Sequence, residues 1–183
     1  MNHDEAIELV KTNIKHQNIF LHMVAVEAIM KALAQHLKED EILWGLAGLL
    51  HDIDFEETAK SPERHGILAQ EILKGKVPDE ILRAIKAHNS KYSGVFPQSN
   101  MEKALIASDA VSGLIIACAL VMPSKKVKDI SVETVKKKFK DKDFARGADR
   151  NRIALCREIG MTLEEFFKIA LEGIRNVSQE LGI

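Results

Sequence analysis

The pair His51-Asp52 directly follows an apolar run, residues 42–50. This position predicts that an imidazole and a carboxylate lie side by side in the protein interior. Burying an imidazole beside a carboxylate is costly unless a partner compensates both groups. A metal ion does so, because a neutral imidazole nitrogen and a carboxylate oxygen are two of its common ligands. Further candidates of the same kinds lie on apolar segments with helical spacing: His22, His65, His88 and Asp109. Together these residues predict a metal centre in an all-helical core.

The type of metal chemistry is narrowed by the absence of thiols from this set. The two cysteines, Cys118 and Cys156, lie far apart without a CxxC pattern, so they are expected to be reduced, buried side chains. A set of histidines and carboxylates suits a hydrolytic or oxygen-handling metal better than a structural zinc site rich in cysteine. No secretory signal opens the sequence, and a cytoplasmic location is expected.

Helical geometry makes joint ligation plausible. Adjacent residues on a helix diverge by about 100°, so His51 and Asp52 can both reach an ion beside the helix. The other candidates, His22, His88 and Asp109, share stripes with apolar neighbours, so their side chains should point inward. His65 is expected in the first turn of its helix, where a ligand can face a cleft.

Almost every segment has helical periodicity and none alternates convincingly, which predicts an all-α fold. The expected helix boundaries come from capping residues, glycines and prolines. Helices are predicted at about 4–14, 19–37, 40–50, 61–75, 78–88, 101–122, 131–139 and 149–159, with a last one after the capping box of Thr162 and Glu165; residues 89–100 are predicted to form a loop.

The apolar stretch 104–122 raises the question of a membrane span. Ser108, Asp109, Ser112 and Gly113 interrupt it, and a carboxylate in the middle of a span would be expensive in lipid. The stretch is therefore interpreted as a buried core helix, and no membrane partner is expected.

Length and charge describe one ordinary globular domain. The chain has 183 residues and a net charge of -1, so nothing global points to nucleic acid or an anionic membrane. A single domain over 1–183 is predicted, with a metal-binding core at about 18–120 and a helical C-terminal accessory part at about 124–183. The lysines at 125–142 are interspersed with acids, which indicates a solvated face.

At the candidate ligands the chain resembles the HD superfamily of metal-dependent phosphohydrolases. The matching pieces are His22 in FLHMVAVEA, His51-Asp52 in GLLHDID, His65 in PERHGILAQEIL, His88 in IKAHN and Asp109 in IASDAVSG. The ordered set is far more specific than the dipeptide alone, and it covers roughly residues 18–120. The common HDIG signature would place glycine at position 54, where this chain has Asp54, so the substrate of an HDIG subgroup does not transfer.

The resemblance implies the architecture of the metal centre. Family knowledge implies that His22, His51, Asp52 and Asp109 hold one ion. The presence of His65 and His88 resembles the subgroup that holds a second ion, with Asp52 as the bridge. The cofactor is thus expected to be a divalent metal, two ions per chain, with Fe, Mn, Ni, Co, Mg and Zn all compatible with such ligands.

The implied reaction is attack of a metal-bound hydroxide on phosphorus. A metal lowers the pKa of bound water from about 16 to about 7, and two ions can hold that hydroxide and a phosphoryl oxygen together. Asp52 and Asp54 are the candidate catalytic acids, and Asp54 could orient either the water or a ligand histidine. Phosphate-binding candidates are Lys91 and Arg146, the latter because arginine offers paired planar donors, with Lys60 and Lys86 as further options.

The predicted function is hydrolysis, as a phosphomonoesterase or a phosphodiesterase, of a small phosphorylated substrate, for which a nucleotide is one candidate. One alternative is an HD-fold diiron oxygenase with much the same ligands, and a second is a catalytically weak nucleotide-binding module. No nucleic acid polymer is expected as a partner. The sequence names neither the substrate, the metal nor the oligomeric state.

Overall fold

The computed structural model describes all residues, 1–183, and contains helices and turns without a strand. The all-α fold class predicted from periodicity is therefore confirmed. The α-helices are α1 His3–Asn13, α2 Gln17–Leu37, α3 Glu41–Leu50, α4 Phe55–Thr58, α5 Leu68–Leu73, α6 Asp79–His88, α7 Ser90–Ser93, α8 Asn100–Val121, α9 Val132–Lys140, α10 Arg150–Ala154, α11 Leu163–Asn176 and α12 Ser178–Leu181. Short 3-10 helices cover Pro62–Arg64, Val127–Asp129 and Leu155–Ile159.

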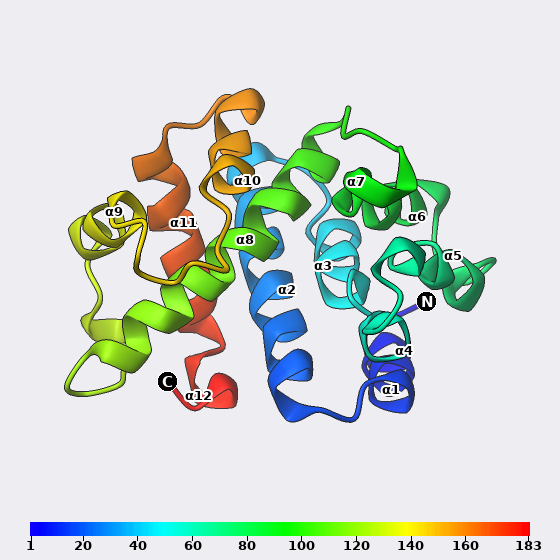
Figure 1. Cartoon of the computed structure of the whole chain (residues 1–183), viewed down its shortest axis with the longest axis horizontal. Helices are drawn as coiled ribbons and strands as arrows, with labels where there is room; N and C mark the ends of the chain where they lie inside the picture. The colour runs from blue at the N-terminus through cyan, green and yellow to red at the C-terminus, as the bar shows by residue number, and fades with distance from the viewer.

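Two long helices, α2 and α8, form the centre of the molecule (Figure 1). On one side, α3 packs against α2, and α6 packs against both α3 and α8. On the other side lies the C-terminal part, in which α11 packs against α2 and α9, and α10 packs against α8. The C-terminal helices thus share the core of the bundle, whose buried cluster runs from Ala6 to Leu181.

The apolar pattern of α3 explains its central place. Nearly all sides of this helix are apolar, and every residue from Trp44 to Leu50 is buried. Its start is fixed by Asp40, whose carboxylate accepts hydrogen bonds from the amides of Ile42 and Leu43, as the sequence predicted. Gly48 allows α3 to approach α2 closely, because a Cβ there would lie 2.8 Å from the Cα of Glu27. The close contact of α2 and α3 fixes the distance between the residues that follow.

Helix α8 is the apolar helix that raised the question of a membrane span. It is long and apolar enough to cross a membrane, but 67% of its most apolar window is buried inside the bundle. This agrees with its interpretation as a core helix.

The boundaries were predicted well where side-chain caps define them. Ser131 caps α9, Asp149 caps α10, and Thr162 forms a capping box with Glu165 at α11. The predicted start of the first helix was wrong, because Asn2 rather than Asp4 forms its capping box. The expected loop at 89–100 contains the short helix α7.

The predicted helix at 61–75 was also wrong in its first half. Ser61 makes no capping hydrogen bond, and only a 3-10 turn at Pro62–Arg64 precedes an extended His65 and the positive-φ Gly66. The regular helix α5 begins at Leu68. His65 consequently lies in a non-helical link, where its backbone amide bonds to the carbonyl oxygen of Pro62.

Candidate metal centre

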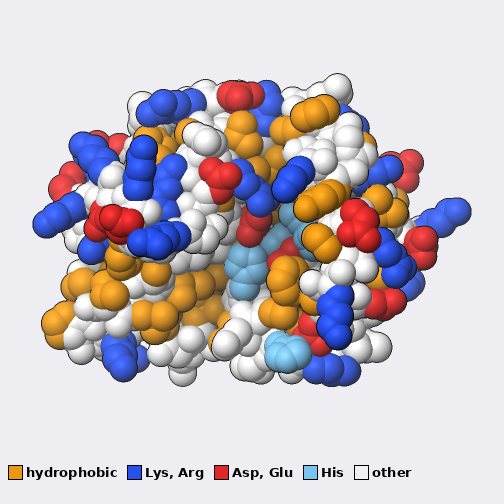
Figure 2. Space-filling view, in the orientation of Figure 1, with side chains coloured by type: hydrophobic (Ala, Val, Ile, Leu, Met, Phe, Trp, Pro, Cys, Tyr) orange, Lys and Arg blue, Asp and Glu red, His pale blue; other side chains and the backbone are white.

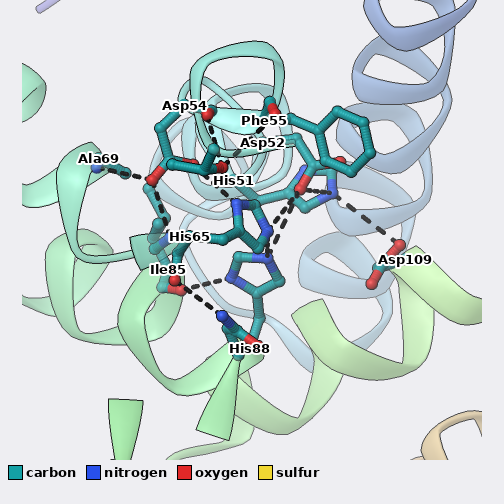
Figure 3. Close-up of polar contacts among 12 residues, drawn as sticks. His51, Asp52, Asp54, Phe55, His65, Ala69, Ile85, His88 and Asp109 are labelled. Atoms are coloured by element: carbon teal, nitrogen blue, oxygen red, sulfur yellow. Dashed lines mark hydrogen bonds and ion pairs between the residues drawn. The ribbon is translucent and has the colours of Figure 1, made fainter. Parts of the chain in front are cut away.

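The predicted ligands converge from different elements at the junction of α2, α3, α6 and α8. Figure 3 shows the rings of His51, His65 and His88 turned toward one another, with Asp52 beside them. His51 is the C-terminal capping residue of α3, and Asp52 lies in the turn that follows. The remaining ligands come from α2, the link before α5, the last residue of α6, and the middle of α8: His22, His65, His88 and Asp109.

Two clusters within this group have the geometry of metal sites, and they share Asp52. In each, one ligand atom per residue lies within 4.8 Å of the others. The clusters are His22, His51 and Asp52, and Asp52, His65 and His88. Asp109 completes the first cluster, because its Oδ1 lies 3.3 Å from the Nε2 of His22 and 4.0 Å from that of His51.

The carboxylate of Asp52 lies at the centre of the arrangement. Its Oδ1 is 3.4 Å from the Nε2 of His51, 3.3 Å from that of His65 and 3.5 Å from that of His88. Its Oδ2 is 3.7 Å from the Nε2 of His22. A carboxylate placed in this way can serve both clusters.

Hydrogen bonds at Nδ1 orient the two most buried histidines. The Nδ1 of His51 donates to the carbonyl oxygen of Gly48 at 2.8 Å, and the Nδ1 of His88 donates to that of Ile85. A carbonyl oxygen can only accept, so Nδ1 carries the proton and Nε2 keeps its lone pair. Such partners fix the tautomer that a metal requires.

The other two histidines are oriented in the same sense. His65 donates from Nδ1 to Asp54, at 2.8 Å. The Nδ1 of His22 lies 3.1 Å from the hydroxyl of Ser112, whose proton is given to the carbonyl oxygen of Asp109, so the hydroxyl accepts from His22. In all four rings Nε2 therefore faces the centre.

The facing Nε2 atoms show that the residues fit divalent ions. Nε2 atoms lie 3.2 Å apart in the pair His22 and His51, and 2.9 Å apart in the pair His65 and His88. Facing lone pairs repel unless a proton or a cation lies between them. Neutral imidazoles with two carboxylates form the ligand set of Zn, Fe, Mn, Co and Ni sites. The geometry is compatible with one ion in each cluster.

Asp54 is buried and fully engaged, which the sequence left open. One oxygen accepts from His65, and the other accepts from the amides of Gly66 and Ala69, at 2.8 Å and 2.9 Å. Its side chain therefore has no free oxygen to bind a water or a substrate proton. Of the two roles considered for Asp54, the geometry favours the orientation of a ligand histidine.

Burial and charge shift the pKa values of His51, in the first cluster, and His65, in the second, in opposite directions. Burial lowers the pKa of His51 to about 4, so its ring is neutral at pH 7. For His65, burial acts in the same direction, but hydrogen bonds and charges of Asp52 and Asp54 raise the pKa to about 10. Before an ion binds, His65 is thus a cation held by two carboxylates.

Both central carboxylates remain ionised. Burial opposes this, yet the polar contacts with the surrounding imidazoles of His51, His65 and His88 hold the pKa of Asp52 well below its ordinary range. For Asp109, burial is likewise outweighed by the contacts with His22 and His51 and by the charge of Arg152, which hold its pKa low. Ionised carboxylates are the form that binds a metal.

Arg152 is the residue at this centre that sequence reasoning missed. From α10, its Nη2 donates to the Oδ2 of Asp109 at 2.8 Å and to the carbonyl oxygen of His88 at 3.1 Å. Arg152 and Asp109 are 43 residues apart, and no local pattern pairs them. The accessory part of the chain thereby contacts two of the candidate ligands, Asp109 and His88.

The two predicted phosphate-binding residues lie outside the clusters. Lys91 is exposed on α7, with its Nζ 5.0 Å from the ring centroid of Tyr92. Arg146 is also exposed and forms a surface ion pair with Asp143 at 3.0 Å. Lys91 follows His88 closely in the sequence, whereas Arg146 is distant in sequence from every candidate ligand. Their role in substrate binding stays a prediction.

An all-helical bundle in which histidine and aspartate side chains converge from separate elements is typical of a class of metal-dependent hydrolases. Comparison with known families identifies it: the HD domain model matches residues 19–122, more than half of the chain. The chain belongs to the HD domain family, as its motifs predicted. Membership places it in a superfamily of metal-dependent phosphohydrolases.

One curated relative is Ribonuclease Y of Desulfotalea psychrophila (strain LSv54 / DSM 12343), which is 31% identical over 140 residues. The aligned part covers 74% of this chain but 26% of that protein, so this chain corresponds to about a quarter of the relative's length. No solved structure matches the chain.

Proposed function

We propose that this protein is a phosphohydrolase with two divalent ions, which hydrolyses phosphate esters of small molecules, nucleotides among them. The ligands proposed for the two ions are those predicted from the sequence: His22, His51, Asp52, His65, His88 and Asp109. When bound, the ions would activate water and neutralise phosphoryl charge.

The observation that carries this proposal is the convergence of four Nε2 atoms on one carboxylate. Each ring is fixed by a separate hydrogen bond at Nδ1, so the protein's own contacts orient the four rings toward the centre. A purely structural role would not need this arrangement, since burying His51 and Asp52 without a cation is costly. The geometry therefore supports metal binding as the role of this site.

The protein's own side chains have distinct tasks in this scheme. Asp52, within reach of both clusters, bridges the two sites. Asp54 holds His65 in the orientation that turns Nε2 inward. Arg152 holds Asp109 through Nη2, so that its charge is available beside the centre for an anionic substrate. Together these contacts favour an anionic phosphate ester as substrate.

The substrate class is also supported by the relative. Its name describes it as a ribonuclease, and RNA is linked by phosphate esters. The shared HD domain thus favours phosphate esters over the C–C or C–P bonds that a diiron oxygenase would cleave. Both monoesters and diesters remain within the proposal.

The experiment is metal analysis of protein purified without chelator, followed by a hydrolysis screen. Nucleoside monophosphates, cyclic nucleotides, sugar phosphates and a short RNA would be tested with Mn, Fe, Co, Ni, Mg and Zn. We expect about two ions per chain, as in two-metal hydrolases, and turnover of a small ester that EDTA abolishes. Oxygen consumption without phosphate release would instead establish an oxygenase. Tight nucleotide binding without product would establish a binding module.

A further inference from the structure

Helix α8 contains a glycine near its middle that close packing does not require. Gly113 lies one turn after Asp109, and glycine weakens a helix interior relative to alanine. Its φ is not positive, and a Cβ added there would meet no atom within 4 Å. Gly113 is exposed although residues 110–112 and 114–115 are buried. The space beside it is therefore open.

That space is a cavity of about 230 Å³ between the core and the accessory part. Figure 2 shows histidine and acidic side chains near the middle of the same face of the molecule. The cavity reaches the metal centre directly, because His22 and Asp109 are among its lining residues. The rest of its lining is Ala110, Gly113, Gly147, Ala148, Asp149 and Arg152.

Two polar side chains in this lining have hydrogen-bonding atoms without a protein partner. Arg152 uses only Nη2 for its bonds to Asp109 and His88, so Nε and Nη1 have no protein acceptor. Asp149 accepts the amides of Asn151 and Arg152 through Oδ1 alone, so Oδ2 has no protein donor. The free N–H groups of Nε and Nη1 can each donate to a phosphate oxygen, and a free carboxylate oxygen accepts from a hydroxyl.

We infer that this cavity is the subsite for the organic group of the substrate, with Arg152 binding a phosphate oxygen. The occupant is a compact hydroxylated group attached to the phosphate, such as a sugar ring, with a hydroxyl bonded to Asp149. Pockets for larger ligands measure about 300–1,000 Å³, so only one such group fits and any further part lies in solvent. Gly113 and Gly147, whose added Cβ atoms would both meet nothing, leave the room that this group needs.

This inference rests on the proposed function and names the substrate class of the same site. It gives the C-terminal part a role in recognition, since Gly147, Asp149 and Arg152 all belong to it. It also distinguishes substrates by the size of the group beside the phosphate. Methyl phosphate would leave the cavity empty, whereas ribose 5-phosphate would fill it.

The test is Gly113→Leu, which fills the cavity without touching a metal ligand. We expect unchanged metal content and a thermal midpoint at least as high as wild type. KM for ribose 5-phosphate should rise at least about tenfold, as for a filled pocket, and that for methyl phosphate should change little. Val121→Leu is the control, because Val121 is 60% exposed on the same helix and does not line the cavity. Equal effects on both esters, or no effect, would overturn the inference.

Arg152→Lys tests the phosphate contact, with Arg157→Lys as the exposed control. Lysine keeps the charge near Asp109 but lacks the second pair of donors, so KM should rise for both esters with normal metal content. An unchanged KM would overturn the phosphate contact.

Direct binding separates failure of the subsite from failure of the proposed function. If wild type hydrolyses none of the phosphate esters in the screen, the hydrolase proposal fails, and calorimetry on metal-loaded protein still tests the cavity. Binding of ribose 5-phosphate that Gly113→Leu loses, with binding of inorganic phosphate retained, would support the subsite. Equal binding by both proteins, or no binding by wild type, would exclude it.

Discussion

The two sides of the metal centre differ in how their histidines are held. His51 is completely buried at the end of α3, and α3 packs closely on α2, which carries His22. His65 lies in a non-helical link and owes its orientation to Asp54. The pKa is lowered to about 4 at His51 and raised to about 10 at His65. The core helices hold both histidines of the first side, whereas on the second side His65 depends on one buried carboxylate.

This comparison predicts the largest loss of metal and activity for Asp52, which the two clusters share, and for His51, which is fully buried. His51→Ala or Asp52→Ala should remove metal binding and all hydrolysis, because Asp52 contacts both clusters. Stability should fall as well, since ligation joins several helices. Metal content and thermal unfolding with and without EDTA measure this. Full occupancy with normal activity in either variant would refute the site.

A smaller loss is predicted for the second side alone. The double variant His65→Ala/His88→Ala should keep about one ion per chain and turn over substrate slowly, since the His22, His51 and Asp52 cluster is untouched. Asp54→Asn serves as an intermediate case, because the side-chain amide keeps one acceptor oxygen and cannot accept from both His65 and the amides of Gly66 and Ala69 in this arrangement. Two ions in the double variant would show that the second site lies elsewhere.

The two clusters should also differ in the number of protons that they release when metal binds. At pH 8, His65 is protonated because its pKa is about 10, whereas His51 is neutral because its pKa is about 4. Metal uptake should therefore displace about one proton from His65 and none from His51. Calorimetry in buffers of different ionisation enthalpy would count the protons, and His65→Ala should release about one fewer. The difference should shrink above pH 10, where His65 is already neutral.

The smallest effect is predicted for the exposed cations outside both clusters. Lys91→Ala/Arg146→Ala should leave metal content normal and change KM or kcat modestly if either residue contacts the phosphate. Arg146 forms an exposed ion pair, and such pairs contribute little to stability, so unfolding should be unaffected. Kinetics equal to wild type would eliminate both residues from substrate binding.

The predictability of the helices follows from local signals. Helix α9 and helix α11 were placed correctly because Ser131 and Thr162 cap them through neighbouring amides. The segment 61–75 was misjudged for the opposite reason. There, Asp54 accepts the amides of Gly66 and Ala69 from outside the segment, and this bonding replaces the first turns of the expected helix. A contact over 12 residues or more leaves no local signature.

The sequence by itself determined the fold class, the family and the set of candidate ligands. Periodicity places residues on the inner faces of helices, and the ordered His and Asp motifs require no knowledge of packing. Only the tertiary structure decided that Asp54 orients His65, that Arg152 reaches Asp109, and that Gly113 borders a cavity. These relations depend on how separate helices are packed, because bonds and open space between distant segments arise only when the chain is folded.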